Sequence, residues 1–215
     1  MSSRVWIFDL DDTLHNASAH IFPVMNRAMT QYMMDMLALD EATAHDMRQH
    51  YWQIYGATLK GLMRHHAGHP SYFCPRHFLH ETHNFLNLPD MVLQVKRLRH
   101  LLNGLSGRKL VFTNAPRDYA LRVLDIMGIA DCFELVFSVE STKFHGKPSV
   151  RGFQMLLKTI NIKASDCIML EDSLPALMTA KRLGMTTIWV TKKLKKPNFV
   201  DYRLSEVLAL THIRL

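Results

Sequence analysis

The sequence predicts an α/β protein in which helices cover a parallel sheet and one helical segment is inserted near the start of the chain. Two observations support this fold class. Five short apolar runs alternate with segments of helical spacing, and one interval between runs is much longer than a connection between neighbouring strands requires. Alternating strands and helices are typical of a parallel sheet with helices on both faces.

The first apolar run, residues 4–8, ends in Asp9, Asp11, Asp12 and Thr13. Side chains two residues apart on a strand point the same way, so Asp9 and Asp11 are expected to project toward one place. Two carboxylates repel unless a divalent cation or a shared proton neutralises them, which indicates a Mg²⁺ site or acid–base chemistry. The alternative is a strand that runs into an acidic helix N-cap, with Asp12 or Thr13 as the cap.

The four later runs repeat this layout, because each ends in polar residues. The expected strands are 109–112, 135–137, 167–170 and 186–190, and the expected helices between them cover 121–127, 153–160 and 177–183. Parallel strands bring their carboxyl ends to one edge of the sheet, where open α/β folds place their chemistry. We therefore predict a Rossmann-like core with the polar strand ends gathered on one edge.

About a hundred residues separate the first run from the second. A crossover between parallel strands needs only a dozen or more, so this interval contains an insertion. Helical spacing fills the interval at 21–36, 47–55, 59–63 and 76–85, and 91–102 is expected to be the crossover helix. We predict a core of residues 1–14 and 90–215 and a helical cap of residues 15–89. The cap is expected to act as a lid.

Four separated motifs resemble those of a known family. They are Asp9-Leu-Asp-Asp-Thr13, Thr113-Asn114, Lys147-Pro148 and Glu171-Asp172. Their order over the whole core resembles the haloacid dehalogenase-like hydrolase superfamily, whose members are mostly phosphatases. The segment 51–62, taken together with 112–115, resembles the pyrimidine 5′-nucleotidase branch of that superfamily. The chain departs from the branch at Asp12, where Asn is usual, and at Ala176, near which the branch has another Asn.

The resemblance implies a phosphomonoesterase that forms an aspartyl-phosphate. Asp9 would be the nucleophile, and Asp11 would act as general acid and then general base. Thr113 and Asn114 would hydrogen-bond the substrate phosphate, and Lys147 would add positive charge there. Taken alone, Thr113 is more simply a strand-end hydroxyl and Lys147 a solvated loop lysine.

Lys143 is an alternative to Lys147 as the cationic residue. The Lys147-Pro148 pair favours Lys147, because proline suits the first turn of the following helix and keeps the preceding residue extended at its entrance.

The expected cofactor is Mg²⁺. The resemblance implies that Asp172, the Asp9 side chain and the Asp11 backbone carbonyl would hold it, which agrees with the preference of Mg²⁺ for a few carboxylates with phosphate and water. Glu171 is expected to be either a second carboxylate ligand or a structural partner. Successive strand residues face opposite ways, so only one of the pair Glu171 and Asp172 needs to reach the metal.

The expected partner is a small phosphorylated substrate, in particular a pyrimidine nucleoside 5′-monophosphate. Tyr51, Tyr55 and Thr58 are spaced to approach one helix face, and Tyr55 is expected to bind substrate by stacking on the base. Gly56 and Gly61 would let backbone approach the ligand. The alternative is that these tyrosines only pack the cap against itself.

Two other functions stay open. Glu171-Asp172-Ser173 resembles the motif of sugar-phosphate mutases, so the alternative is a sugar-phosphate phosphatase or a phosphomutase on the same core. A nucleic-acid-binding protein is a more distant alternative, because 26 basic residues exceed 19 acidic ones and Lys192–Lys196 is a basic loop. A solvated surface explains that loop more simply, and no nucleic-acid module is recognised, so nucleic acid is not expected as a partner.

The remaining patterns are typical of a cytoplasmic protein. No apolar run approaches the ~18 residues of a membrane span, and the start of the chain lacks a signal-peptide profile. Cys74, Cys132 and Cys167 are scattered and are expected to be free thiols. A histidine-rich stretch, residues 65–83, contains potential zinc ligands. Its last three histidines step by three residues around a helix and do not form one face, so we expect solvated histidines rather than a zinc site.

Overall fold

The computed structural model describes residues 4–68 and 73–213. The chain divides into two compact units. An α/β unit contains Met1–Ala17 and Val92–Leu215, and a helical unit contains Ser18–Met91. These boundaries lie a few residues after those expected from the sequence.

The described part of the α/β unit contains one six-stranded sheet, in the order β3-β2-β1-β4-β5-β6. All neighbouring strands are parallel. The strands are β1 (Val5–Phe8), β2 (Arg108–Phe112), β3 (Leu135–Phe137), β4 (Cys167–Glu171), β5 (Thr186–Val190) and β6 (Tyr202–Leu204). The prediction of a parallel, Rossmann-like α/β core is confirmed. The short edge strand β6 was not predicted, because its three residues carry no clear strand pattern.

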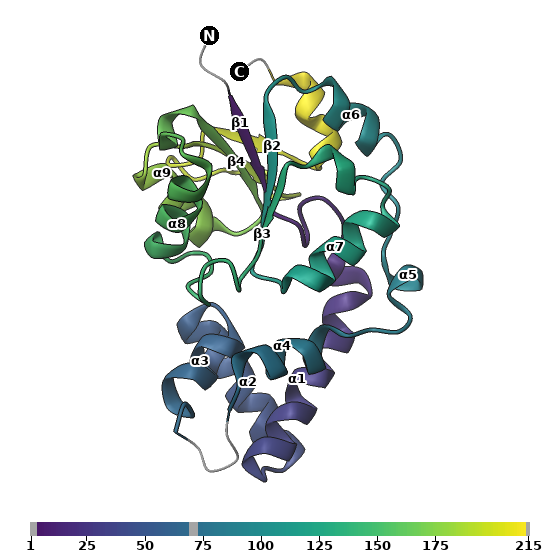
Figure 1. Ribbon diagram of the computed structural model, residues 1–215, viewed down its shortest axis with the longest axis vertical. Helices are drawn as coiled ribbons and strands as arrows, with labels where there is room; N and C mark the ends of the chain where they lie inside the picture. The colour runs from purple at the N-terminus through teal and green to yellow at the C-terminus, as the bar shows by residue number, and fades with distance from the viewer. Residues whose placement is uncertain (1–3, 69–72, 214–215) are drawn as a thin grey trace. The chain divides into compact units, whose positions relative to one another are not determined.

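Helices cover both faces of this sheet. Figure 1 shows α8 and α9 on one side of the strands and α6 and α7 on the other. The helices are α6 (Leu98–Gly104), α7 (Arg117–Ile126), α8 (Val150–Ile160) and α9 (Leu174–Arg182). Side chains of a strand alternate between faces, so Ile7 packs in the core with Phe153 of α8 and Leu177 of α9, while Phe8 lies against Phe133. Burial on both faces explains the continuous apolar run of β1.

The helical unit is built from five described helices. They are α1 (Ile21–Leu37), α2 (Glu41–Tyr55), α3 (Thr58–His65), α4 (Pro75–His83) and α5 (Leu88–Met91). Helix α1 packs on α2 and α4, and α2 packs on α3. Asp40 caps α2 by accepting a hydrogen bond from the Thr43 N–H at 2.9 Å. Buried apolar side chains at helical spacing, such as Met25 and Met33 of α1, form the interior of this unit.

The expected crossover helix over residues 91–102 is wrong in its first half. Helix α5 ends at Met91, residues 92–97 are not helical, and α6 begins at Leu98. Arg97 has a φ of 69°, in the left-handed region, which a right-handed helix cannot contain. The apolar spacing that predicted one long helix therefore continues through residues 92–97, where the backbone is not helical.

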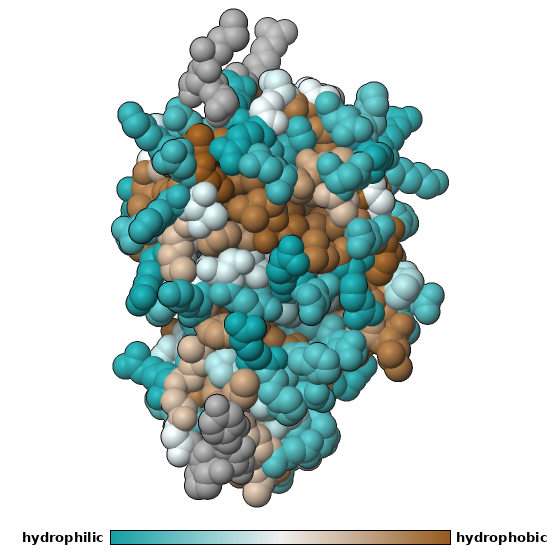
Figure 2. Space-filling model, viewed as in Figure 1, coloured by the Kyte–Doolittle hydropathy of each residue, from teal (hydrophilic) through white to brown (hydrophobic). Residues whose placement is uncertain are grey.

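The surface agrees with the composition. Figure 2 shows hydrophilic side chains over much of the visible face, with apolar side chains between them. Across the described ranges, no helix combines the length and the hydropathy that a bilayer span requires. Cys74, Cys132 and Cys167 are free thiols, as predicted, and Cys167 is buried.

Candidate active site

The polar ends of β1, β2 and β4 come together in the α/β unit because β1 pairs with both other strands. The Asp9 N–H donates to the carbonyl of Leu170 at 2.9 Å, which places the end of β1 beside the end of β4. Short apolar strands thus deliver several chemically active side chains to one edge of the sheet.

Lys147 lies between two of these strand ends. Its Nζ donates to Asp9 Oδ1 at 2.5 Å and to Glu171 Oε2 at 2.6 Å, and all three side chains are buried. The structure thus places Lys147, rather than Lys143, beside the carboxylates. Pro148 follows a cis peptide bond and precedes Ser149, the N-cap of α8, so the expectation that Pro148 occupies the first helical turn is wrong.

Glu171 and Asp172 occupy different positions in the cluster. Glu171 Oε1 accepts a hydrogen bond from the Ser173 N–H at 3.0 Å, so both of its carboxylate oxygens have protein partners. Asp172 is fixed through its backbone carbonyl, which accepts from Trp189 Nε1 at 2.8 Å. The Asp172 carboxylate contacts that of Glu171 but is less buried, so Asp172 is better placed than Glu171 to accept a cation.

The cluster is rich in negative charge. Carboxylate oxygens of Asp9, Glu171 and Asp172 lie within 4.8 Å of one another, and the ammonium of Lys147 contacts two of them, Asp9 and Glu171. Burial, with repulsion from Glu171, raises the pKa of Asp9 to about 7. Burial also raises the pKa of Glu171 to about 7 and that of Asp172 to about 6. Burial opposes the charge on Lys147, but Asp9 and Glu171 outweigh burial and raise its pKa.

Two buried carboxylates, of Asp9 and Glu171, and the partly buried carboxylate of Asp172 offer the hard oxygen donors that Mg²⁺ prefers, and their negative charge fits a divalent cation. The donor chemistry therefore fits the expected metal.

Thr113 and Asn114 follow β2 and lie beside this cluster. Thr113 is buried, and its Oγ1 accepts from the Ala115 N–H at 3.0 Å, so its own hydroxyl hydrogen remains a donor. Asn114 Nδ2 donates to the backbone carbonyl of Lys147 at 2.9 Å and so anchors the loop that carries Lys147, here called the lysine loop. A Cβ on Gly146 would lie 2.2 Å from Asn114 Oδ1, which explains glycine at that position.

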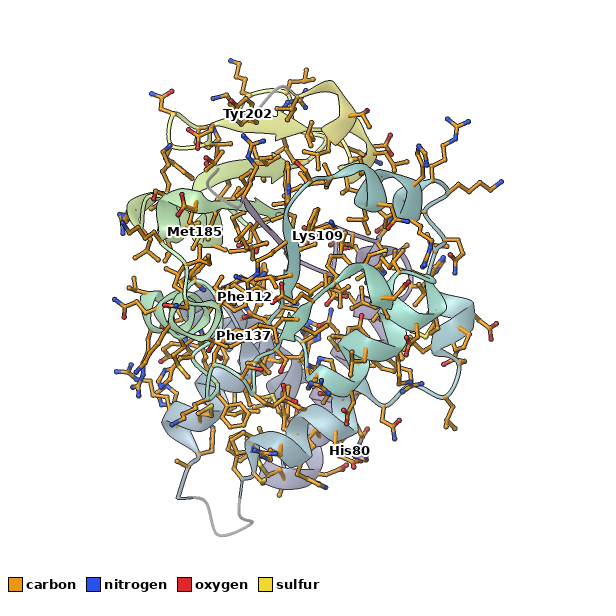
Figure 3. The ribbon with its side chains drawn as sticks, turned by 45° about the horizontal axis from the view of Figure 1, so that its top comes forward. His80, Lys109, Phe112, Phe137, Met185 and Tyr202 are labelled. Atoms are coloured by element: carbon orange, nitrogen blue, oxygen red, sulfur yellow. The ribbon has the colours of Figure 1, made fainter. Side chains whose placement is uncertain are left out.

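An aromatic pair on the sheet lies next to Lys147, and one of its rings contacts the lysine. Phe112 and Phe137 lie close together on β2 and β3, with ring centroids 5.8 Å apart (Figure 3). Lys147 Nζ lies 5.3 Å from the centroid of the Phe112 ring. The ammonium of Lys147 therefore has a cation–π contact with Phe112 in addition to its ion pairs.

Asp11 has two partners that the sequence reasoning missed. Tyr119, from α7, donates its hydroxyl to Asp11 Oδ1 at 2.6 Å, and His15 Nε2 lies 3.0 Å from the same oxygen. Burial and the negative charge of Asp11 raise the pKa of Tyr119, which keeps its hydroxyl protonated. The position of His15 four residues after Asp11 was a local signal, whereas nothing local relates Tyr119 to Asp11.

In the helical unit, Tyr51 and Tyr55 form a cluster with two histidines. The Tyr51 ring is buried and stacks on His65 with centroids 5.4 Å apart, and its hydroxyl lies 2.8 Å from His66 Nε2. The Tyr55 hydroxyl lies 2.6 Å from His65 Nε2, and the Tyr55 side chain is partly exposed. Tyr51 thus packs this unit internally, while Tyr55 keeps an accessible surface.

One expectation about this segment is wrong. Gly56, at a φ of 75°, ends α2, so Thr58 lies on α3 rather than on a shared helix face with the tyrosines. Thr58 is buried, and its hydroxyl donates to the carbonyl of Arg48 at 3.4 Å. Gly61 also packs against Tyr51, because a Cβ there would lie 2.1 Å from the Tyr51 ring.

The histidine-rich stretch forms no metal cluster within the described ranges, where Asp9, Glu171 and Asp172 make up the one group identified. His69 lies outside the described residues. The expectation of solvated histidines is wrong for His83, which is buried and contacts the carbonyl of Leu79 at 3.0 Å.

Comparison with known proteins finds a family model that matches most of the chain. A family model described as haloacid dehalogenase-like hydrolase matches residues 6–190. Phosphate metabolism protein 8 of Saccharomyces cerevisiae is 29% identical over 138 residues, which cover 61% of this chain and 42% of that protein. Validoxylamine A 7′-phosphate phosphatase of Streptomyces hygroscopicus subsp. limoneus is 28% identical over 116 residues, which cover 52% of this chain and 54% of that protein. The match therefore spans about half the length of these curated relatives.

A solved structure has the same fold over nearly the whole chain. CbbY from Rhodobacter sphaeroides, in complex with phosphate, aligns with a TM-score of 0.66 and 18% identity over 95% of this chain and 94% of that one.

Proposed function

Because the chain belongs to the haloacid dehalogenase-like hydrolase family, we propose that it is a Mg²⁺-dependent phosphomonoesterase that works through an aspartyl-phosphate. One observation carries this proposal. Asp9 lies buried beside Lys147, in contact with it at 2.5 Å, within a group of three carboxylates that suits a divalent cation. This arrangement combines a nucleophile, a fixed positive charge and a metal-binding group at one strand edge.

In the first step, a carboxylate oxygen of Asp9 attacks the phosphorus of the ester. The bond between phosphorus and the ester oxygen breaks as the bond to Asp9 forms. Asp11 gives a proton to the departing oxygen, so the leaving group departs as an alcohol. Lys147 and the hydroxyl of Thr113 stabilise the negative charge on the transferring phosphoryl group.

In the second step, Asp11 accepts a proton from water while the water oxygen attacks phosphorus. The bond between phosphorus and Asp9 breaks, inorganic phosphate leaves, and both carboxyl groups return to their starting states. The sum of the two steps consumes one ester and one water and yields one alcohol and one phosphate.

Asp9 and Asp172, with the backbone carbonyl of Asp11, would hold Mg²⁺, which when bound adds positive charge to the phosphoryl oxygens. Glu171 is assigned to hold Lys147 in place, because both of its oxygens accept protein hydrogen bonds. Asn114 is assigned mainly to the lysine loop, through its bond to the Lys147 carbonyl.

The proposed substrates are nucleoside 5′-monophosphates with a pyrimidine base. Support comes from the resemblance of residues 51–62 to the pyrimidine nucleotidase branch and from the accessible ring of Tyr55. A sugar phosphate is the second candidate, because Glu171-Asp172-Ser173 resembles the motif of sugar-phosphate mutases, and one relative is named as a phosphatase of validoxylamine A 7′-phosphate, which is not a nucleotide by its name.

A phosphate-release assay over a panel of monoesters, with Mg²⁺ or with excess chelator, tests the proposal. We expect wild-type release that depends on Mg²⁺, and Asp9→Asn should lower turnover by about a thousandfold or more because the amide cannot form the acyl-phosphate. Asp125→Asn, on the exposed side of α7, is the matched control. Normal turnover of pure Asp9→Asn protein would contradict the nucleophile, and full activity in chelator would contradict the metal.

A further inference from the structure

Two donors, one four residues and one 108 residues away in the sequence, converge on one oxygen of Asp11. The Tyr119 hydroxyl lies 2.6 Å and His15 Nε2 lies 3.0 Å from Asp11 Oδ1. Tyr119 is 2% exposed and His15 is 3% exposed, whereas the Asp11 side chain retains 14% of its surface. Solvent therefore hardly reaches either donor, while Asp11 itself remains accessible.

The chemistry of the three groups fixes the direction of both bonds. A carboxylate oxygen only accepts hydrogen bonds, so the His15 ring must present Nε2–H to Asp11. His15 Nδ1 is buried and has no hydrogen-bond partner among the described residues, which agrees with a ring whose hydrogen is on the other nitrogen. Tyr119 has a single hydroxyl hydrogen, and its bond to Asp11 uses it.

We infer that His15 and Tyr119 are positioning residues that hold Asp11 by Oδ1 and leave Oδ2 to give and take the proton. This role rests on the proposed function, in which Asp11 is the general acid and base. Neither residue belongs to the motifs that suggested that function.

The arrangement suits a group that changes its protonation state during the reaction. When Oδ2 carries the proton, Oδ1 is a carbonyl oxygen and still accepts both hydrogen bonds. When the proton leaves, Oδ1 is a carboxylate oxygen and accepts them again. The side chain therefore keeps one orientation in both steps, and the same oxygen faces first the leaving group and then the attacking water.

Leaving-group dependence separates this role from a purely structural one. The ratio kcat/KM covers the steps through departure of the leaving group. A nucleoside 5′-monophosphate has an alkoxide leaving group that needs a proton, whereas p-nitrophenol leaves without much help. A badly positioned acid should therefore impair the first substrate more than the second, whereas general loss of structure should impair both alike.

The experiment compares Tyr119→Phe, His15→Met and His15→Gln with the wild type on UMP and on p-nitrophenyl phosphate. Because general acid–base catalysis is typically worth ~10²–10⁴-fold, loss of one positioning bond should lower kcat/KM for UMP by about tenfold, and for p-nitrophenyl phosphate much less. His15→Gln keeps an N–H near the Nε2 position and should retain more activity than His15→Met. The variants Tyr202→Phe and His100→Gln are the controls.

The pattern across substrates decides the outcome. Equal losses on both substrates, or no loss on either, would overturn the positioning role while the phosphatase reaction stands. If a variant unfolds, the remaining single variant and His15→Gln still give the comparison, because each alters only one of the two bonds. A wild-type protein that releases no phosphate from any ester would instead overturn the proposed function, and the Asp11 role with it.

Discussion

At the scale of single residues, the main feature is an imbalance of charge. Lys147 contacts Asp9 and Glu171, and Asp172 lies in the same cluster. Burying charges is costly, and a buried ion pair repays that cost only with good geometry and further hydrogen bonds. One ammonium cannot neutralise three carboxylates, so the cluster favours either protons or a divalent cation.

This imbalance predicts how Mg²⁺ binding depends on pH. The pKa values of Asp9 and Asp172, about 7 and about 6, lie above the ordinary 3.8. A carboxyl group whose pKa is raised in the folded state favours folding when it is protonated. The contribution of Asp9 and Asp172 to the stability of the metal-free protein should therefore fall as the pH rises from about 4 to about 7. Mg²⁺ binds the ionised forms, so the rise in Tm that it causes should be larger at pH 8 than at pH 5.5.

Thermal unfolding with and without Mg²⁺ at the two pH values measures this effect without any substrate. Asp172→Ala should remove most of the Mg²⁺-induced rise in Tm, and Asp125→Ala should leave it unchanged. A rise of the same size at both pH values would contradict the assignment of these carboxylates as ligands.

At the scale of elements, a glycine sets how closely two helices approach. Helices α2 and α3 pack through Tyr51 and Gly61, and a Cβ on Gly61 would lie 2.1 Å from the Tyr51 ring atom Cγ. The ring is buried between His65 and the backbone of α3, so it has little room to move. Contact this short requires a shift of a helix or of the ring.

Gly61→Ala should therefore destabilise the protein by about 1–3 kcal/mol, the usual cost of overpacking a core. Urea unfolding gives the free energy. Gly104→Ala is the matched control, because Gly104 is also helical and no atom lies within 4 Å of an added Cβ. The control should be neutral or stabilising by up to about 1 kcal/mol. A Gly61→Ala protein as stable as the control would show that α2 and α3 separate easily.

At the scale of the whole molecule, the chain combines an α/β unit that contains every proposed catalytic group with a separate helical unit. The same catalytic chemistry can serve many phosphate esters, so a preference among esters has to come from groups outside that set. The Tyr55 ring is the proposed group in the helical unit.

We predict that UMP and CMP are hydrolysed faster than AMP and GMP, and that Tyr55→Ala reduces this preference. Stacking on a base is worth ~1–3 kcal/mol, so the preference should fall by about fivefold or more, with little change for p-nitrophenyl phosphate. Tyr55→Phe keeps the ring but removes the hydroxyl that contacts His65, and should keep the preference. Trp52→Ala, at an exposed aromatic residue of α2, is the control. Equal rates for purine and pyrimidine substrates would contradict the proposed specificity.

Local sequence pattern predicted the fold class of the α/β unit and five of its six described strands, β1 to β5. Apolar runs that end in polar residues are a property of a few neighbouring residues, and burial on both faces of a parallel sheet requires such runs. For that reason β1, β2 and β4, with Asp9, Thr113 and Glu171 at their ends, could be located from the sequence.

Tertiary structure alone decided which groups bond to one another. Tyr119 lies 108 positions from Asp11, and Lys147 lies 138 positions from Asp9, distances over which no periodicity operates. The role of Glu171 as the partner of Lys147, and the break at Arg97 between α5 and α6, likewise depend on contacts and backbone dihedrals outside any local pattern. Periodicity reports which face of an element is buried, whereas hydrogen bonds between distant residues depend on how the folded chain brings those faces together.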